Sequence, residues 1–229
     1  MIPVLDCTPR DRFPITTIAF IALNSAAMLW LLFLSDNPSR AIEHLGLVPT
    51  RALTLAERGG SPLATAVPFL TSIFLHVDVL AHFLPNMLFL WVFGGKVEDR
   101  LGHFGLIPFL LTGGLIAGAA HVAAHPTSIT PTLGASGSVS AVMGAYLVLH
   151  PGSRILSVVL PIVWVQLRIP ALVWLGAFFA LQLYMGLHSA ANTEIAWWAH
   201  VGGFVFGSLI LLLLGRSGAA PLKGASTRA

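Results

Sequence analysis

Ser136 and His200 are the residues of this sequence whose surroundings best suit chemistry. Ser136 stands in an apolar stretch, residues 132–146, where Ser136, Ser140 and Gly144 recur at a spacing of four and so share one face of a helix. A face with so little side-chain bulk allows a neighbouring helix to come very close.

The histidine lies on a face of the same kind. In residues 199–207, His200, Gly203 and Gly207 occur at positions i, i+3 and i+7 of a predicted helix. If the two faces pack together, a serine hydroxyl meets an imidazole inside a membrane, which is the minimum apparatus of a hydrolase with a serine nucleophile and a histidine base. The small residues expected to pack around this site are Gly134, Gly137, Ser140, Gly144, Gly203 and Gly207.

A third group could supply hydrogen-bond donors to the same reaction. His82 and Asn86 are four residues apart, so a ring N–H and an amide NH2 can converge from one helical face. Acyl transfer needs donors directed at the developing oxyanion, each contributing roughly 2.7–4 kcal/mol. The backbone N–H of Ser136, at the start of a helix, would be a further donor.

The composition places this chemistry in a membrane. Of the 229 residues, 56% are hydrophobic and only 9% are charged, with a mean hydropathy of +0.85, whereas soluble domains have about 25% charged residues. The net charge of +3 comes from bases scattered between apolar runs, which favours cytoplasmic loops over a nucleic-acid surface. The single cysteine, Cys7, excludes an internal disulfide and a multi-cysteine metal cluster.

The apolar runs predict an all-α polytopic membrane protein, a bundle of six transmembrane helices. The expected spans, each of roughly the ~20 residues that a bilayer requires, are residues 13–34, a segment within 67–93, 104–124, 132–149, about 170–187, and 195–214. We expect residues 36–66 to lie on or dip into the membrane surface and a stretch around 156–168 to be interfacial. The whole is interpreted as an N-terminal segment (1–12), one membrane domain (13–214) and a short basic tail (215–229).

Six spans place both termini on one side of the membrane. With cytoplasmic termini, nine basic residues lie inside and three outside, which fits the positive-inside bias. The inside set is Arg10, Arg12, Lys96, Arg100, Arg154, Arg168, Arg216, Lys223 and Arg228; the outside set is Arg40, Arg51 and Arg58. Ser136 and His200 then lie at similar depth, towards the outer face.

Each of these groups also has a purely structural interpretation. A serine in a membrane helix often bonds back to an i−4 carbonyl, an interior histidine is often only hydrogen-bonded, and His82 with Asn86 could simply hold helices together. The remaining histidines near span ends match no metal-ligand spacing, so neither a metal nor another cofactor is expected; they are His76, His103, His121 and His125.

Taken together and in order, the motifs resemble the rhomboid family of intramembrane serine proteases over residues 74–207. They are Phe74-Leu75-His76, His82-x-x-x-Asn86-Met87, residues 90–102 (LWVFGGKVEDRLG), Gly134-Ala135-Ser136-Gly137, and Ala199-His200-x-Gly202-Gly203-x-x-x-Gly207. The resemblance implies a catalytic dyad without an aspartate, with Ser136 as nucleophile and His200 as general base and acid. It further implies an oxyanion hole from His82, Asn86 and the Ser136 amide, and single-span membrane proteins as substrates.

The sequence also departs from the family pattern. Ser140 occupies the position where some members place an aromatic residue that stacks on the histidine, so that support must come from elsewhere. Residues 77–81 lack the Gly-Gly-Trp of many bacterial relatives, Pro85 removes a backbone donor directly before Asn86, and residues 36–66 contain no Trp-Arg pair.

Two other functions and one question of location stay open at this point. The chain could be a rhomboid-like protein that binds client helices in the bilayer without cutting them, although such relatives usually lose the serine or the histidine. A transporter or channel is disfavoured because there is no inverted repeat and only Asp78 offers a buried carboxylate. The short N-terminal segment contains Asp6 and Asp11, which is not typical of a mitochondrial transit peptide, so we expect a bacterial inner membrane. The sequence leaves the oligomeric state and the individual substrate open.

Overall fold

The computed structural model describes residues 2–7, 9–158, 166–190 and 195–216. Five helices in these ranges are long and apolar enough to cross a membrane. They are Ile15–Leu34 (α1, Ile15–Leu29, with the π-helical turn Trp30–Leu34), Val79–Leu101 (the π-helical turn Val79–Phe83 and α5, Leu84–Leu101), His103–Ala124 (α6), Ala171–His188 (α8) and Trp197–Gly215 in α9 (Trp197–Arg216). The polytopic helical fold is therefore confirmed, and four spans begin and end within about two residues of the prediction.

The fourth predicted span is shorter than expected. The helix α7 comprises only Ser136–Leu149, 14 residues, which at 1.5 Å per residue is about 21 Å, less than the ~30 Å of a bilayer core. The prediction of a helix from residue 132 was wrong because Thr132 pairs with Leu47 in an isolated β-bridge and Gly134 has a φ of +108°. Ser136 is consequently the first residue of a helix that starts inside the bundle.

The second span begins later than predicted. Residues 67–78 do not continue into it, because α4 (Pro62–Thr71) ends in the short 3-10 turn Ser72–Phe74 and the chain then becomes extended. Asp78 starts the span by accepting a hydrogen bond from the backbone of Ala81, and Pro85 lies where the π-helical turn Val79–Phe83 passes into α5.

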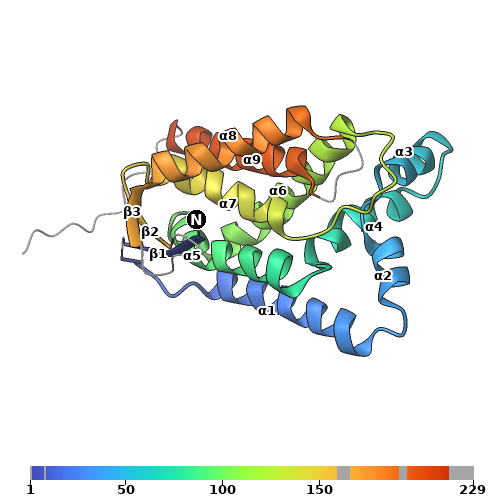
Figure 1. Cartoon of the computed structure of the whole chain (residues 1–229), viewed down its shortest axis with the longest axis horizontal. Helices are drawn as coiled ribbons and strands as arrows, with labels where there is room; N and C mark the ends of the chain where they lie inside the picture. Colours follow the sequence, from blue (N-terminus) through green and yellow to red (C-terminus); the bar gives the residue numbers. More distant parts are fainter. Residues whose placement is uncertain (1, 8, 159–165, 191–194, 217–229) are drawn as a thin grey trace, which may run out of the picture.

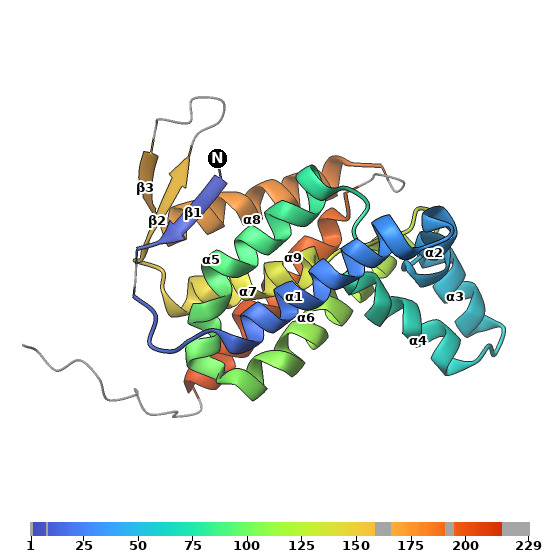
Figure 2. The ribbon, with the colours of Figure 1, turned by 90° about the horizontal axis from the view of Figure 1, so that it is seen from below.

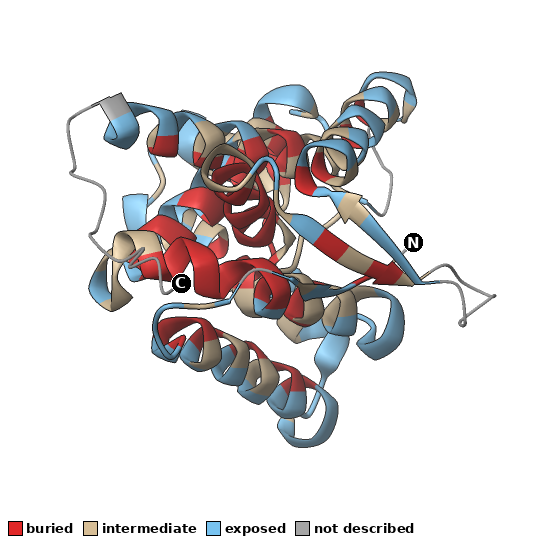
Figure 3. Cartoon of the chain, turned by 90° about the vertical axis from the view of Figure 1, so that its left-hand side faces the viewer, coloured by how far each residue is buried: buried red, intermediate tan, exposed pale blue. Residues whose placement is uncertain are grey.

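The helix α7 is the centre of the bundle. It packs against α5, α6 and α9, and all its residues from Gly137 to Tyr146 are buried. Figure 3 shows the same pattern for the whole chain, with buried positions in the middle and exposed ones on the outward faces of the helices. Exposed large apolar side chains such as Phe33, Phe104 and Leu213 are what a bundle surrounded by lipid requires.

Two peripheral parts lie at opposite ends of the bundle (Figures 1 and 2). At one end is a three-stranded antiparallel sheet in the order β1-β2-β3, formed by Ile2–Asp6, Arg154–Val158 and Gln166–Pro170. At the other end are α2 (Pro38–Leu45), α3 (Pro49–Glu57) and α4.

The sheet is a correction to the purely helical prediction. Residues 1–12 were interpreted as a polar segment and residues 156–168 as an interfacial stretch, but Ile155 pairs with both Asp6 and Ile169. The signal is weak because each strand has five residues and only long-range pairing stabilises it. Residues 159–165 of that stretch and 217–229 of the predicted tail lie outside the described residues.

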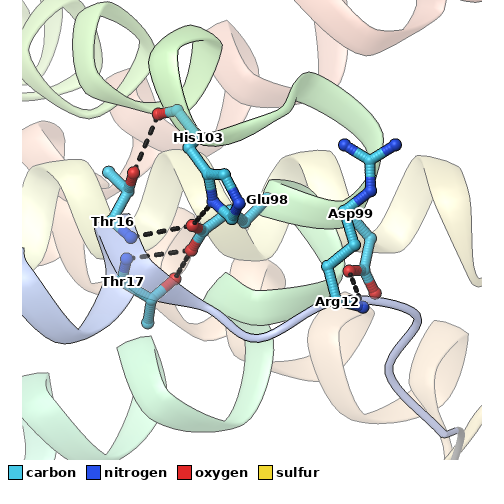
Figure 4. Close-up of polar contacts among 6 residues, drawn as sticks. All are labelled: Arg12, Thr16, Thr17, Glu98, Asp99 and His103. Atoms are coloured by element: carbon cyan, nitrogen blue, oxygen red, sulfur yellow. Dashed lines mark hydrogen bonds and ion pairs between the residues drawn. The ribbon is translucent and has the colours of Figure 1, made fainter.

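A buried carboxylate attaches α1 to the second and third spans (Figure 4). Glu98, with 2% of its side chain exposed, accepts hydrogen bonds from the backbone N–H groups of Thr16 (2.7 Å) and Thr17 (2.9 Å), from the Thr17 hydroxyl (2.7 Å) and from His103. The backbone N–H groups of Thr16 and Thr17 lie in the first turn of α1, where they have no acceptor within the helix. A carboxylate at this end also interacts favourably with the helix dipole.

Asp99 holds the segment before α1 in the same way. Its carboxylate accepts from the backbone N–H of Asp11 (3.0 Å) and Arg12 (2.9 Å), and it lies 3.7 Å from the Lys96 ammonium. Successive acidic residues at the end of α5 therefore position the first span relative to the core.

Replacing Glu98 by alanine is expected to lower the stability of the bundle. The N–H groups of Thr16 and Thr17 would stay buried without an acceptor, at a cost of about 1–3 kcal/mol. Thermal unfolding of the purified protein in detergent should show a lower midpoint for Glu98→Ala than for Glu57→Ala, a change at an exposed glutamate of α3. Equal midpoints for the two variants would contradict this role of Glu98.

Candidate functional site

Gly134 shapes the entry to the helix that begins with Ser136. Its φ of +108° is a conformation that glycine adopts readily and other residues rarely do. A methyl group at this position would overlap Nε2 of His82, so the imidazole lies directly against the backbone two residues before the serine. The structure thereby brings the predicted donor His82 next to the predicted nucleophile.

A second histidine supports this arrangement from behind. The rings of His76 and His82 are 4.8 Å apart, and Nε2 of His76 accepts a long hydrogen bond of 3.4 Å from the backbone N–H of Ala135. His76 is fully buried, and burial lowers its pKa to about 4, so the ring is neutral at pH 7 and able to accept. His76 was passed over as a site residue in the sequence; its place in the Phe74-Leu75-His76 motif was the available signal.

Asn86 lies in the same span as His82, and one of its amide hydrogens is already used in a hydrogen bond. It is buried, and its Nδ2 donates a 2.9 Å hydrogen bond to the carbonyl oxygen of His82, one turn earlier. One amide hydrogen is thus used within the helix, and the second stays available for another acceptor.

The small face of α9 predicted from the sequence lies against α7, but it meets Gly137 and Ala141, each one residue after the predicted Ser136 and Ser140, while Gly144 of the predicted face meets Phe204. A methyl group on Gly203 would overlap the carbonyl oxygen of Gly137, and one on Gly207 would overlap that of Ala141. Because both contacts advance along both chains by four residues, α7 and α9 run parallel at close to backbone contact. His200 lies one turn before Gly203, and Ser136 lies directly before Gly137.

His200 is held by neighbours that the sequence analysis did not identify. Its Nδ1 is 2.7 Å from Oε1 of Gln182 on α8, and Trp197, one turn earlier on α9, presents its ring at 88° with a centroid distance of 6.3 Å. Ser140 is buried on α7, so the support that an aromatic residue gives in some relatives comes here from Gln182 and Trp197. The available signal was that Gln182 is a polar residue inside an apolar span.

A small cavity lies beside the serine. Ser136, Gly137 and Ala199 line a space of about 20 Å³, enough for one water molecule. Within the described residues no hydrogen bond joins Ser136 Oγ to the His200 ring, so the dyad bond stays a prediction. Such bonds are often long in an unliganded enzyme and tighten when substrate binds.

In the described ranges, no three His, Cys, Asp or Glu side chains gather as metal ligands would. The groups available at this place are a hydroxyl, three imidazoles, two amides and the N–H groups at the start of α7.

A multispan helical bundle in which Ser136 and His200 lie on the closely packed helices α7 and α9 defines an integral membrane protein. The family model described as Rhomboid domain matches residues 64–217, more than half of the chain. The chain belongs to the rhomboid family, whose members are generally serine proteases of the membrane, although some are inactive.

Curated relatives from three organisms show the same relationship. The zebrafish (Danio rerio) presenilin-associated rhomboid-like protein A, mitochondrial, is 30% identical over 62% of this chain and 36% of its own length. RHOMBOID-like protein 12, mitochondrial, of Arabidopsis thaliana is 29% identical over 58% of this chain and 42% of its own. The mitochondrial rhomboid protein 1 of Saccharomyces cerevisiae is 29% identical over 64% and 41%. The chain thus spans about two fifths of the length of these relatives.

Replacing Gly207 by alanine should separate α7 from α9. The new methyl group meets the Ala141 carbonyl oxygen, a backbone atom that cannot rotate away, and such overpacking costs about 1–3 kcal/mol. We expect a lower unfolding midpoint in detergent together with reduced labelling of Ser136 by a serine-reactive fluorophosphonate.

Gly176→Ala is the matched control for this prediction. Gly176 also lies in a membrane helix, but a methyl group there meets nothing within 4 Å, so alanine should be neutral or slightly stabilising. If Gly207→Ala behaved like Gly176→Ala, the close packing of α7 on α9 would not control the site.

Proposed function

We propose that this protein is an intramembrane serine endopeptidase that cleaves transmembrane segments of single-span membrane proteins. The observation that carries the proposal is the α7–α9 contact, because it fixes the helix start with Ser136 beside the turn that carries His200. Membership of the rhomboid family supports the same reaction class.

In this mechanism Ser136 Oγ attacks the scissile carbonyl carbon and Nε2 of His200 takes the hydroxyl proton. The tetrahedral intermediate collapses as the C–N bond breaks, and His200 returns the proton to the leaving amine. A water molecule, deprotonated by the same imidazole, then hydrolyses the acyl-enzyme and restores the serine. The cavity of about 20 Å³ lined by Ser136 supports this step, because it can hold one water molecule beside the serine.

The negative charge of the intermediate needs donors on one side of Ser136. We assign this role to the backbone N–H of Ser136, to the His82 ring beside Gly134, and to the free amide hydrogen of Asn86. The unpaired N–H groups at the start of α7 add the positive end of the helix dipole to the same place.

The substrate must present an accessible carbonyl, whereas a membrane helix hides its carbonyls in its own hydrogen bonds. Segments with Gly or Pro near the outer end should therefore be preferred, because they unwind more cheaply. With cytoplasmic termini, the end of the bundle that carries the sheet lies inside and the end at which α7 begins lies towards the outer face, as the charge distribution favours.

The bilayer in which the protein works stays a prediction. The sequence favours a bacterial inner membrane, while the three relatives are named as mitochondrial proteins. The integral multispan character is common to both locations.

The alternative function is that of an inactive rhomboid-like protein that binds client transmembrane helices. The observation in its favour is that the described structure has no hydrogen bond between Ser136 and His200. Against it, both residues are present and lie on helices in close contact.

A cleavage assay separates the two functions. Wild-type protein in detergent should cut a single-span substrate, and both Ser136→Ala and His200→Ala should reduce the rate by at least about 10³-fold, because a nucleophile or its base is lost. Ser25→Ala is the control, since the Ser25 hydroxyl donates to the Ile21 carbonyl on α1 (2.8 Å). Equal inertness of all variants, with no probe labelling of Ser136, would favour the binding function.

The oxyanion assignment has its own test in Asn86→Ala. Loss of one donor to the transition state should lower kcat about 10²-fold with little change in KM. Asn24→Ala is the matched control, because Asn24 on α1 makes the same 2.9 Å bond to the carbonyl four residues earlier. If both variants lost activity equally, Asn86 would act through helix structure instead.

A further inference from the structure

We propose that Gln182 is a positioning residue that holds the imidazole of His200 in the tautomer and orientation required of the base. The Gln182 side-chain oxygen accepts a hydrogen bond from Nδ1–H of His200, which leaves Nε2 unprotonated and free to face Ser136. The inference rests on the proposed protease function and adds a third polar residue to the dyad.

The contact is short and well enclosed. Oε1 of Gln182 and Nδ1 of His200 are 2.7 Å apart, and Gln182 is only 5% exposed. A buried amide is costly unless its polar atoms are paired, so a glutamine at this position of a membrane helix needs a partner such as His200.

Contacts between α8 and α9 on either side of Gln182 place it level with His200. One turn further along α8, the carbonyl oxygen of Gly186 accepts a 3.1 Å hydrogen bond from the indole of Trp198. One turn earlier, the ring of Phe179 packs on Phe204 with centroids 4.8 Å apart. Gln182 and His200 lie between these two contacts, so the antiparallel pairing of α8 and α9 sets their distance.

The chemistry explains why an amide suits this role. In serine hydrolases the group on Nδ1 selects the tautomer, and a group that donates instead of accepting there leaves the wrong nitrogen free. Within the described residues no carboxylate is hydrogen-bonded to His200. A neutral acceptor orients the ring without placing a second charge in the apolar bundle.

The test compares three variants of the whole protein. Gln182→Met keeps the volume and removes the acceptor, Gln182→Glu keeps an acceptor and adds a charge, and Leu181→Met changes the exposed neighbour on α8. Each is assayed for kcat and KM on the model substrate across pH, and for thermal unfolding in detergent.

We expect Gln182→Met to lower kcat on the order of 10- to 100-fold, less than the 10²–10⁴-fold that a general base supplies, with KM and the unfolding midpoint near those of Leu181→Met. In Gln182→Glu a carboxylate beside the ring stabilises the imidazolium relative to the neutral ring. Because only the neutral ring acts as base, the acidic limb of the kcat profile should move to higher pH. The other titratable groups that act on this ring, His82 and His121, are the same in all variants.

The outcomes are distinguishable from failure of the protease function itself. If wild type cleaves and Gln182→Met retains full kcat, the inference is overturned while the protease function stands. If Gln182→Met does not fold, the pH profile of Gln182→Glu decides, and an unmoved acidic limb overturns the inference. A wild type that neither cleaves nor is labelled at Ser136 refutes the function on which it rests.

Discussion

The contact between α7 and α9 is the constraint on which the rest of the structure depends. Two membrane helices reach near backbone contact only where both present glycine or alanine, and here Gly203 and Gly207 lie over carbonyl oxygens of α7. That contact determines which turn of α9 faces the start of α7. The remaining helices enclose this pair: α5 and α6 pack on α7, and α8 lies against α9. In an apolar solvent there is little hydrophobic force to bring helices together, so this close fit is itself a source of stability.

Buried polar groups perform the complementary task of fixing registers between elements. Glu98 ties the start of α1 to the end of α5, and the Ser138 hydroxyl donates to the Leu110 carbonyl of α6 (2.7 Å). The Leu47–Thr132 bridge joins the end of the bundle where α2 to α4 lie to the segment before Ser136. Each contact joins distant parts of the chain, and each satisfies a polar atom that lipid could not solvate. The Leu47–Thr132 bridge keeps the segment before Ser136 out of α7, so the first N–H groups of this helix lie within the bundle, where hydrogen bonds to the anion of the proposed mechanism would be strong.

The surroundings of His200 reflect the same cost of placing unpaired polar or charged groups in an apolar bundle. In the proposed mechanism the imidazole of His200 accepts and returns a proton and therefore needs orientation, but a carboxylate next to it in an apolar bundle would have a large desolvation cost. Gln182 supplies an acceptor oxygen without charge, and the Trp197 ring lies edge-on to the imidazole at a centroid distance of 6.3 Å. His76 likewise accepts a backbone N–H while neutral. The candidate site is therefore built from neutral polar groups. This suits the proposed reaction, in which charges form only in the tetrahedral intermediate.

The membrane class, most of the spans, the family, and the helices that carry Ser136, His200, His82 and Asn86 could all be predicted from the amino-acid sequence. They could be predicted because hydropathy and the spacing of small residues are local properties that survive without any knowledge of contacts. The start of α7, the sheet formed by Ile2–Asp6, Arg154–Val158 and Gln166–Pro170, and the contact of Gln182 with His200 became evident only when the chain was folded. Those features rest on pairs of residues far apart in the chain: the Leu47–Thr132 bridge, the pairing of Ile155 with Asp6, and the antiparallel crossing of α8 and α9. A lone glutamine in an apolar span indicates that a partner exists, but which residue it meets is set by helix packing.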